Sequence, residues 1–189
     1  MIGVPSLPEE QTIAPLLSVE PLLHYEPTIG RWLWLLEDTR RETKEALAGL
    51  TPAALDWIPS GSEENSIGTL LYHIALIELD WLYTDVLENQ PWPEELKELF
   101  AVVVRDPQGH LSPVQGVALA EHLHRLDRTR AYLLAAFHHM SLEEFRRPRS
   151  FPQYRVTAEW VLHQLIQHEV EHRGQIQLLR SLAEHTLTA

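Results

Sequence analysis

Residues 157–183 carry a mixed apolar and histidine stripe that constrains the fold more than any other part of the chain. The stripe proceeds at steps of three and four through Val161, Leu165, His168, His172 and Ile176. Residues at these steps share one face of an α-helix. The segment is therefore predicted to form one long helix, and its core-facing stripe includes His168 and His172.

Three further segments, residues 28–50, 66–88 and 112–140, have apolar residues at the same spacing. Ser112 followed by Pro113 is typical of a helix start. Linkers of a dozen or more residues separate the segments, and strand-like alternation is nearly absent. The predicted fold class is all-α, a four-helix bundle with long crossover connections.

Composition limits the classes of protein that remain. The chain has 189 residues, of which 44% are hydrophobic, a formal net charge of −12 and no cysteine. This length suits one domain with a substantial core. Residues 1–27 hold five prolines and are predicted to form an N-terminal arm, which leaves residues 28–189 for the bundle. The net charge argues against nucleic acid as a partner, because nucleic acid is bound mainly through Lys and Arg.

The composition also indicates in which cellular compartment the protein is expected. No apolar run approaches the roughly 20 residues that span a bilayer, and the first residues lack the pattern of a secretory signal. The lack of cysteine excludes disulfides and thiolate ligands and fits the cytosol. We therefore expect a cytoplasmic protein that does not enter the membrane.

His73 is the third histidine that is predicted to face the core. Its neighbours one turn away, Leu70 and Ile77, are apolar. A single buried histidine is usually neutral and bonded to a backbone carbonyl. Three buried imidazoles without a common partner, however, leave donors and acceptors unsatisfied.

A divalent metal ion resolves this difficulty, because His73, His168 and His172 can each offer it a nitrogen at about 2.0–2.1 Å. Such a site keeps one or more positions for water or substrate. Zn²⁺ or Ni²⁺ is the expected ion, with Fe or Mn as alternatives, since imidazole ligands accommodate several of these metals.

The five residues from 168 to 172 also read H-E-x-x-H, a pattern of zinc proteases. A protease needs a third ligand downstream, but Leu178 stands where the metzincin pattern has a histidine, and Glu184 lies too far along the same helix. No predicted sheet offers a track for a peptide. Glu169 lies about 100° around the helix from His168. It is predicted as a catalytic general base or as a partner of a ligand, with a solvated glutamate as the alternative.

The remaining histidines and polar residues have weaker signals. His122, His124 and His163 flank the apolar stripes and are not expected in the site. Arg173 and Gln175 either bind an anionic substrate or orient a ligand, with surface salt bridges as the alternative. Aromatic residues at helical spacing, Tyr72 and Trp160, wall either the pocket or the core.

The two histidine segments together resemble a known family. The stretch SIGTLLYHIA at residues 66–75 and HEVEHRGQI at residues 168–176, with Trp57 and Trp160, resemble the DinB-like (DNA-damage-inducible) proteins over residues 28–183. The resemblance implies a four-helix bundle, often a homodimer, with His73, His168 and His172 as three ligands of a divalent metal. Relatives include thiol-dependent S-transferases and maleylpyruvate isomerase, in which the metal activates a low-molecular-weight thiol.

Three functions therefore remain open from the sequence. The first is a metal-dependent enzyme that activates a thiol or water nucleophile toward a small-molecule substrate, as an S-transferase or a hydrolase does. The second is a non-catalytic metal-binding module with a structural or stress-related role. The third is a helical interaction protein whose histidines are incidental.

Overall fold

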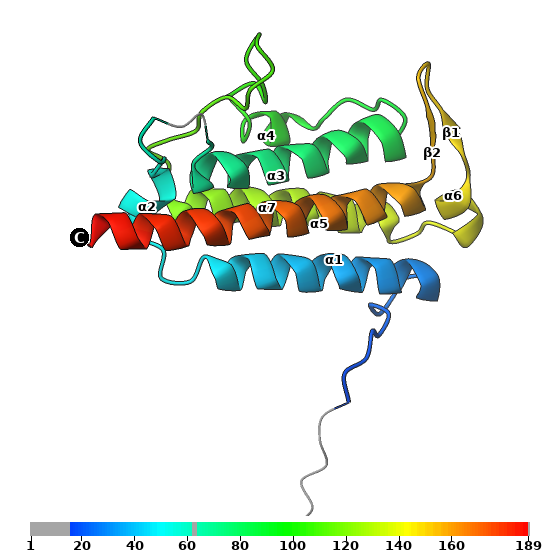
Figure 1. Ribbon diagram of the computed structural model, residues 1–189. Helices are drawn as coiled ribbons and strands as arrows, with labels where there is room; N and C mark the ends of the chain where they lie inside the picture. Colours follow the sequence, from blue (N-terminus) through cyan, green and yellow to red (C-terminus); the bar gives the residue numbers. More distant parts are fainter. Residues whose placement is uncertain (1–15, 62–63, 189) are drawn as a thin grey trace, which may run out of the picture.

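Four long helices form the body of the protein in the computed structural model, which describes residues 16–61 and 64–188 (Figure 1). They are α1 (Pro27–Ala46), α3 (Ile67–Trp81), α5 (Leu119–Phe137) and α7 (Ala158–Leu187). At its C-terminal end α3 continues into a π-helix, η1 (Leu82–Val86). The prediction of an all-α fold is confirmed.

Short elements occupy the linkers between the long helices. They are α2 (Pro52–Asp56), α4 (Glu94–Lys97), α6 (Leu142–Arg146), β1 (Arg149–Ser150) and β2 (Arg155–Val156). The two strands pair antiparallel, with Arg149 opposite Val156. This small hairpin lies between α6 and α7 and caps one end of the bundle (Figure 1).

The helix directions define which connection crosses the bundle. Trp32 contacts Glu159 near the start of α1 and α7, and Arg180 contacts the Ala46 carbonyl near the end of α1, so these two helices run parallel. Figure 1 shows that α3 and α5 also run in one direction, opposite to α1 and α7. The linker of residues 87–118 therefore has to return along the bundle before α5 can begin.

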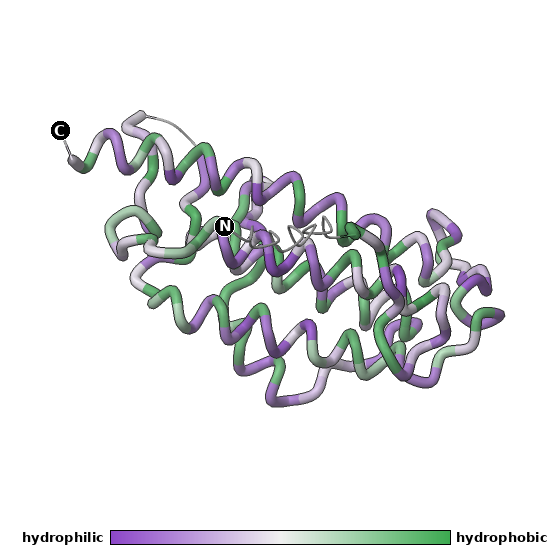
Figure 2. Tube along the Cα trace, turned by 90° about the horizontal axis from the view of Figure 1, so that it is seen from below, coloured by the Kyte–Doolittle hydropathy of each residue, from purple (hydrophilic) through white to green (hydrophobic). Residues whose placement is uncertain are grey.

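Apolar and polar residues alternate along the tubes in Figure 2, but α3 is buried on nearly all sides, since residues 67–76 are buried without a break. The largest core cluster includes Leu33, Leu36, Leu79, Leu133, Phe137, Phe145, Val161 and Leu162. A second cluster, which includes Leu70, Leu71, Ile74, Leu126 and Ile176, lies nearer the N-terminal end of α3. Burial of these side chains, at about 25 cal/mol per Å² of apolar surface, is the main force that holds the helices together.

The predicted start of the third long helix at Ser112 is wrong, because α5 begins only at Leu119. The backbone N–H of Val114 donates to Thr69 Oγ1 at 3.0 Å, and that of Gly116 donates to Asp56 Oδ2 at 2.7 Å. Gly116 also has a φ of 69°, which a helix does not allow. Bonds to other parts of the fold thus replace the helical turn that the local sequence favours.

A buried ion cluster joins all four long helices. It consists of Arg40 from α1, Glu78 from α3, Arg130 from α5 and Glu169 from α7, each at most 4% exposed. The Arg40 guanidinium lies 2.7 Å from both carboxylates, and the Arg130 guanidinium lies 2.9 Å from Glu78 and 3.3 Å from Glu169. Leftover donors of the two arginines reach backbone carbonyls at Leu126 and Leu36, both at 2.8 Å.

The two arginines control the ionisation of Glu169. Burial by itself raises the pKa of this carboxyl group, but the charges of Arg40 and Arg130 outweigh burial, so the pKa of Glu169 lies below its ordinary value. Glu169 is therefore held as an anion between two guanidinium cations.

The end of the N-terminal arm packs against the bundle. The Leu22 N–H donates to the Gly30 carbonyl at 3.2 Å, and the Tyr25 hydroxyl donates to the Leu134 carbonyl at 3.3 Å. A Cβ at Gly30 would lie 3.0 Å from the Leu22 oxygen, so a glycine permits this approach. The first half of the predicted arm, residues 1–15, lies outside the described residues, and the division between arm and bundle stays a prediction.

Within the described part of the chain, no helix combines the length and the hydropathy that a bilayer-crossing segment requires.

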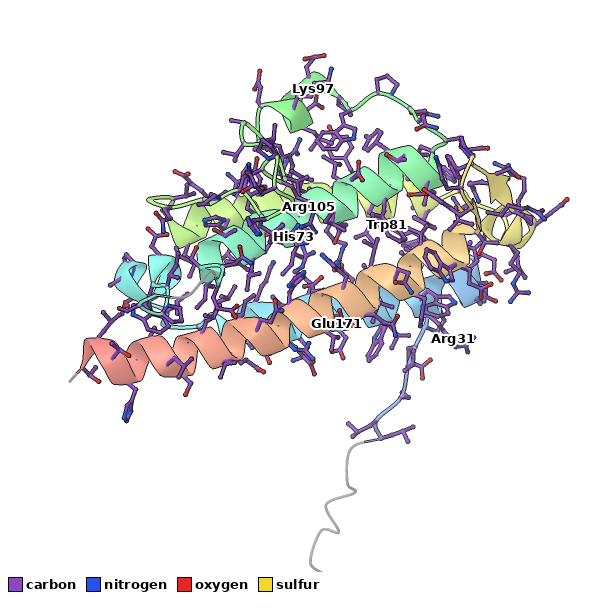
Figure 3. All side chains as sticks on the ribbon, turned by 45° about the horizontal axis from the view of Figure 1, so that its top comes forward. Arg31, His73, Trp81, Lys97, Arg105 and Glu171 are labelled. Atoms are coloured by element: carbon purple, nitrogen blue, oxygen red, sulfur yellow. The ribbon has the colours of Figure 1, made fainter. Side chains whose placement is uncertain are left out.

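The ion cluster generates a prediction about stability. Glu169→Gln removes one buried anion and leaves Glu78 as the one buried carboxylate of the cluster, while Arg130 keeps its contact with the half-exposed Glu37 at 2.7 Å. Because an unpaired buried charge is costly, we expect the free energy of unfolding to fall by about 3 kcal/mol. Glu171→Gln is the matched control, because Glu171 is exposed on the same helix (Figure 3). Urea denaturation of both variants measures the difference, and equal stabilities would contradict a balanced cluster.

Candidate metal centre

Three histidine side chains converge between α3 and α7. The Nε2 atom of His168 lies 3.1 Å from Nε2 of His73 and 3.0 Å from Nε2 of His172. One nitrogen of each ring lies within 4.8 Å of the other two. The prediction that these three residues meet is confirmed by this geometry.

Helix geometry explains the convergence. His168 and His172 are four residues apart on α7, so they lie one above the other on one face. α3 packs against this face of α7, and Figure 3 shows His73 on α3 at the boundary between the two helices. Side-chain oxygens cap both helices: Ser66 Oγ accepts from the Thr69 N–H and Thr157 Oγ1 accepts from the Trp160 N–H. These caps fix where each helix begins.

The environment keeps the rings of His73 and His168 neutral. Burial, followed by the charges of His168 and His172 and then that of Arg105, lowers the pKa of His73 to about 3. Burial and then the charge of His172 lower the pKa of His168 to about 4. Near neutral pH both rings therefore carry a lone pair, which is the form that binds a metal ion.

The donor set fits a divalent cation. Nδ1 of His172 lies 2.7 Å from Oε1 of Gln175, so an Nδ1–H that donates to this oxygen leaves Nε2 free to ligate. Tetrahedral ligands at about 2.0–2.1 Å from an ion lie roughly 3.3–3.4 Å from one another. The observed separations of 3.0 and 3.1 Å therefore need only small ring movements. Nδ1 of His73 is buried without a protein partner among the described residues. The contact that orients a predicted ligand is the one between Gln175 and His172.

The histidines open onto a pocket of about 460 Å³ between α3, α7 and the loop before α5. This volume is in the range of small-molecule sites. The lining residues are Asn65, Leu70, His73, Ile77, Trp81, Arg105, Leu111, Gln164, Leu165, His168, His172 and Gln175. Seven polar or basic side chains thus share the lining with five apolar ones, and among these described lining residues none is acidic.

Glu169 does not line this pocket. It is 2% exposed, and its carboxylate contacts Arg40 and Arg130 inside the bundle. The alternative of a solvated glutamate is therefore wrong. The predicted role as a general base has no geometric support here, because neighbouring positions on a helix diverge by about 100° and the carboxylate points away from the imidazoles.

The other polar residues singled out from the sequence separate into two groups. Gln175 contacts a predicted ligand, as described above. Arg173 instead forms an ion pair of 2.6 Å with Glu42 on α1, which is the surface salt-bridge alternative.

Neither of the two aromatic candidates, Tyr72 and Trp160, is among the residues that line the pocket. The Tyr72 hydroxyl donates to the Val102 carbonyl at 2.7 Å, away from the pocket. Trp160 is 46% exposed and stacks on Trp81, with ring centroids 5.3 Å apart, and Trp81 itself lines the pocket.

His122 lies outside the histidine cluster but is fully buried. Its Nδ1 lies 3.3 Å from an Arg125 nitrogen. Burial, and then the charge of Arg125, lower its pKa to about 4, while Asp56 acts in the opposite direction. A Cβ at Gly68 would lie 3.3 Å from Nε2 of this ring, so the glycine allows α3 to pack closely on it. His124 and His163 also stay outside the cluster, as expected.

Sequence reasoning missed Arg105 and Trp81 as lining residues. Trp81 stands eight residues after His73, and Ile77 stands midway between them, so all three share a face of α3. This spacing would have allowed Trp81 to be predicted as a pocket residue from the sequence. Arg105 lies in an irregular segment, and no periodicity relates it to the histidines.

Comparison with known protein families matches residues 35–176 to the DinB superfamily. Since the match spans most of the chain, the protein belongs to this superfamily, which confirms the resemblance seen in the two histidine segments. A solved structure, described as a conserved protein from Enterococcus faecalis, is similar with a TM-score of 0.65. It is 21% identical, and the alignment covers 82% of this chain and 95% of that one. This likeness shows the fold alone. Comparison with curated proteins found no match.

The contact between Gln175 and His172 generates a prediction about metal affinity. Gln175→Leu removes the acceptor that orients the ring, and we expect zinc affinity to fall about tenfold. Competition with a chromophoric chelator measures the dissociation constant. Gln177→Leu, at an exposed position of the same helix, serves as the control. An unchanged affinity in both variants would show that Gln175 does not orient the ligand.

His122 generates a prediction about pH. Its pKa of about 4 in the folded protein lies below the ordinary value of 6.5, so the unfolded chain binds a proton first as the pH falls. The contribution of neutral His122 to stability is complete above pH 6.5 and is lost between about pH 6.5 and pH 4. One pKa unit corresponds to about 1.4 kcal/mol, so the loss is on the order of 3 kcal/mol.

The measurement compares the wild-type protein with His122→Leu, both metal-free, by urea denaturation across this pH range. The variant should lose less stability on acidification than the wild-type protein does. Parallel pH profiles for the two proteins would contradict the prediction.

Proposed function

We propose that the protein is a metal-dependent enzyme that activates a thiol nucleophile at His73, His168 and His172 and transfers it to a small-molecule electrophile. The convergence of three imidazole nitrogens at the base of a pocket carries this proposal. A divalent ion held there would supply Lewis acidity and lower the pKa of a coordinated thiol or water.

The chain's own residues contribute binding and orientation. Imidazole ligands carry no negative charge, so His73, His168 and His172 would leave the positive charge of a bound ion undiminished. Gln175 holds the ring of His172 in place. Leu70, Ile77, Trp81, Leu111 and Leu165 give the pocket apolar walls, which exclude water from a bound substrate.

The lining favours a thiol over water as the nucleophile. Hydrolysis by a site of the H-E-x-x-H type uses a glutamate as the general base, and Glu169 is held instead by Arg40 and Arg130. Within the described lining no other carboxylate is present. A thiol has an ordinary pKa of about 8.5, well below the roughly 15.7 of water, so coordination to a divalent ion would remove its proton near neutral pH without such a base. The hydrolase alternative is therefore the second candidate.

In this proposal, Glu169 positions α7 and does not take part in the chemistry. It follows His168 directly in the chain and is tied to α1 and α5 through Arg40 and Arg130. It thereby holds α7 in the register that brings His168 to His73.

The test is a coupled measurement of metal content and turnover. The zinc-loaded protein is assayed with glutathione, cysteine or 2-mercaptoethanol as the thiol and 1-chloro-2,4-dinitrobenzene as the electrophile. We expect turnover with at least one thiol, and loss of both zinc and turnover in His168→Ala. His185→Ala, at an exposed position near the end of α7, should keep both.

Three results would overturn the proposal. Turnover that survives complete metal removal would exclude a metal-dependent reaction. Stoichiometric zinc that raises the melting temperature, with no turnover on thiol and ester panels, would establish the non-catalytic module instead. A protein that binds no zinc at all would leave the histidines incidental.

A further inference from the structure

We propose that the pocket takes a ligand that carries a carboxylate, and that Arg105 binds this anionic group beside the histidines. The inference rests on the proposed function, because it names the class of thiol or substrate that the site accepts. Arg105 would then be a specificity-determining residue rather than a solvated loop arginine.

The charge of the pocket is the first observation. The whole chain holds 27 acidic and 15 basic residues, a formal net charge of −12. Among the described residues that line the pocket, Arg105 is nevertheless the one with a permanent formal charge. A cationic pocket on an anionic protein attracts anions to this place and repels them elsewhere.

The second observation is that Arg105 has unused hydrogen-bond donors. Its Nη1 donates to the Gly109 carbonyl at 2.6 Å. Within residues 16–61 and 64–188, no carboxylate lies in ion-pair distance of its guanidinium. A guanidinium has five donors in a planar fork that matches the two oxygens of a carboxylate. The remaining donors are therefore available to a ligand.

The neighbouring aspartate does not neutralise Arg105. The Asp106 carboxylate accepts N–H bonds from Gln108 and His110, both at 2.9 Å, and it does not line the pocket of the histidines. These bonds close a tight turn beneath Arg105. Arg105 is thus the charged group that this turn directs toward the pocket.

The loop that carries Arg105 is anchored at both ends. Arg105 and Leu111 form an isolated antiparallel bridge, and the Ser112 N–H donates to the Val104 carbonyl at 3.1 Å. Arg105 and Leu111 both line the pocket. Figure 3 shows Arg105 on this loop beside His73. The backbone of Arg105 is therefore held by the hairpin, and its exposed guanidinium is tied to the Gly109 carbonyl.

The other lining residues indicate the chemistry of the rest of the ligand. His73, Ile77 and Trp81 follow one face of α3 at steps of four. The rise of about 1.5 Å per residue places Trp81 roughly 12 Å from His73 along the axis. The pocket thus combines an anion-binding residue, a metal-binding centre and an apolar wall. A small carboxylic acid with a hydrocarbon body and a thiol satisfies all three.

The experiment measures thiol binding and does not depend on turnover. The protein is loaded with Co²⁺, and binding of thiols is followed by the absorption band that appears when sulfur coordinates cobalt. The probes are mercaptoacetate, 3-mercaptopropionate and 6-mercaptohexanoate, each compared with the alcohol of the same length. At least one acid should bind tenfold or more tightly than its alcohol, since a hydrogen bond to a charged group contributes about 1.5–3 kcal/mol.

Variants show whether the carboxylate is bound by Arg105 or is coordinated directly by the metal. Arg105→Gln should abolish the preference for the acid and leave the affinity for the alcohol unchanged, while Arg105→Lys should keep part of it. Arg31→Gln is the matched control, because Arg31 is an exposed arginine at the far end of the bundle (Figure 3). It removes the same net charge and should behave as the wild-type protein does.

The outcomes distinguish this inference from the proposed function. If cobalt binds and thiols coordinate, but no acid is preferred, the inference is wrong and the metal site stands. A preference that persists in Arg105→Gln would assign the carboxylate to the metal and also overturn the inference. If cobalt does not bind, the proposed function fails and the inference fails with it.

Discussion

The ion cluster of Arg40, Glu78, Arg130 and Glu169 is the interaction on which the rest of the structure depends. Each long helix contributes one of its members, and each carboxylate contacts both guanidinium groups. Burying charges is costly, and such a cluster is weak evidence for net stability. Its effect on geometry is stronger. Sliding any helix by one turn, about 5.4 Å, would leave a buried charge without its partners.

The ion cluster fixes the register of the two helices, α3 and α7, that carry the three histidines. His168 precedes Glu169 directly, and His73 stands five residues before Glu78, so the same two helices that meet at the cluster meet again at the imidazoles. The apolar core supplies the attraction between the helices, but apolar contacts alone tolerate small shifts. A metal site needs its ligands placed within about half an ångström. The charged cluster and the three histidines are therefore two parts of one arrangement.

Periodicity was enough to predict the all-α fold and the convergence of His73, His168 and His172, because each lies on a stripe of apolar residues. The same logic could have found the ion cluster, since Arg40 follows Leu36 and Arg130 follows Leu126 at a step of four. The start of α5 was not predictable, because bonds to Thr69 and Asp56 from distant parts of the chain decide it. Arg105 was missed for a related reason: a loop residue meets the site only through tertiary structure.

We propose that three imidazoles hold one divalent ion. X-ray absorption at the zinc edge, on protein loaded with one equivalent of zinc, tests it most directly. The account predicts a first shell at about 2.0–2.1 Å in which three ligands show the scattering pattern of imidazole. A first shell of oxygen ligands with no more than one imidazole would contradict it.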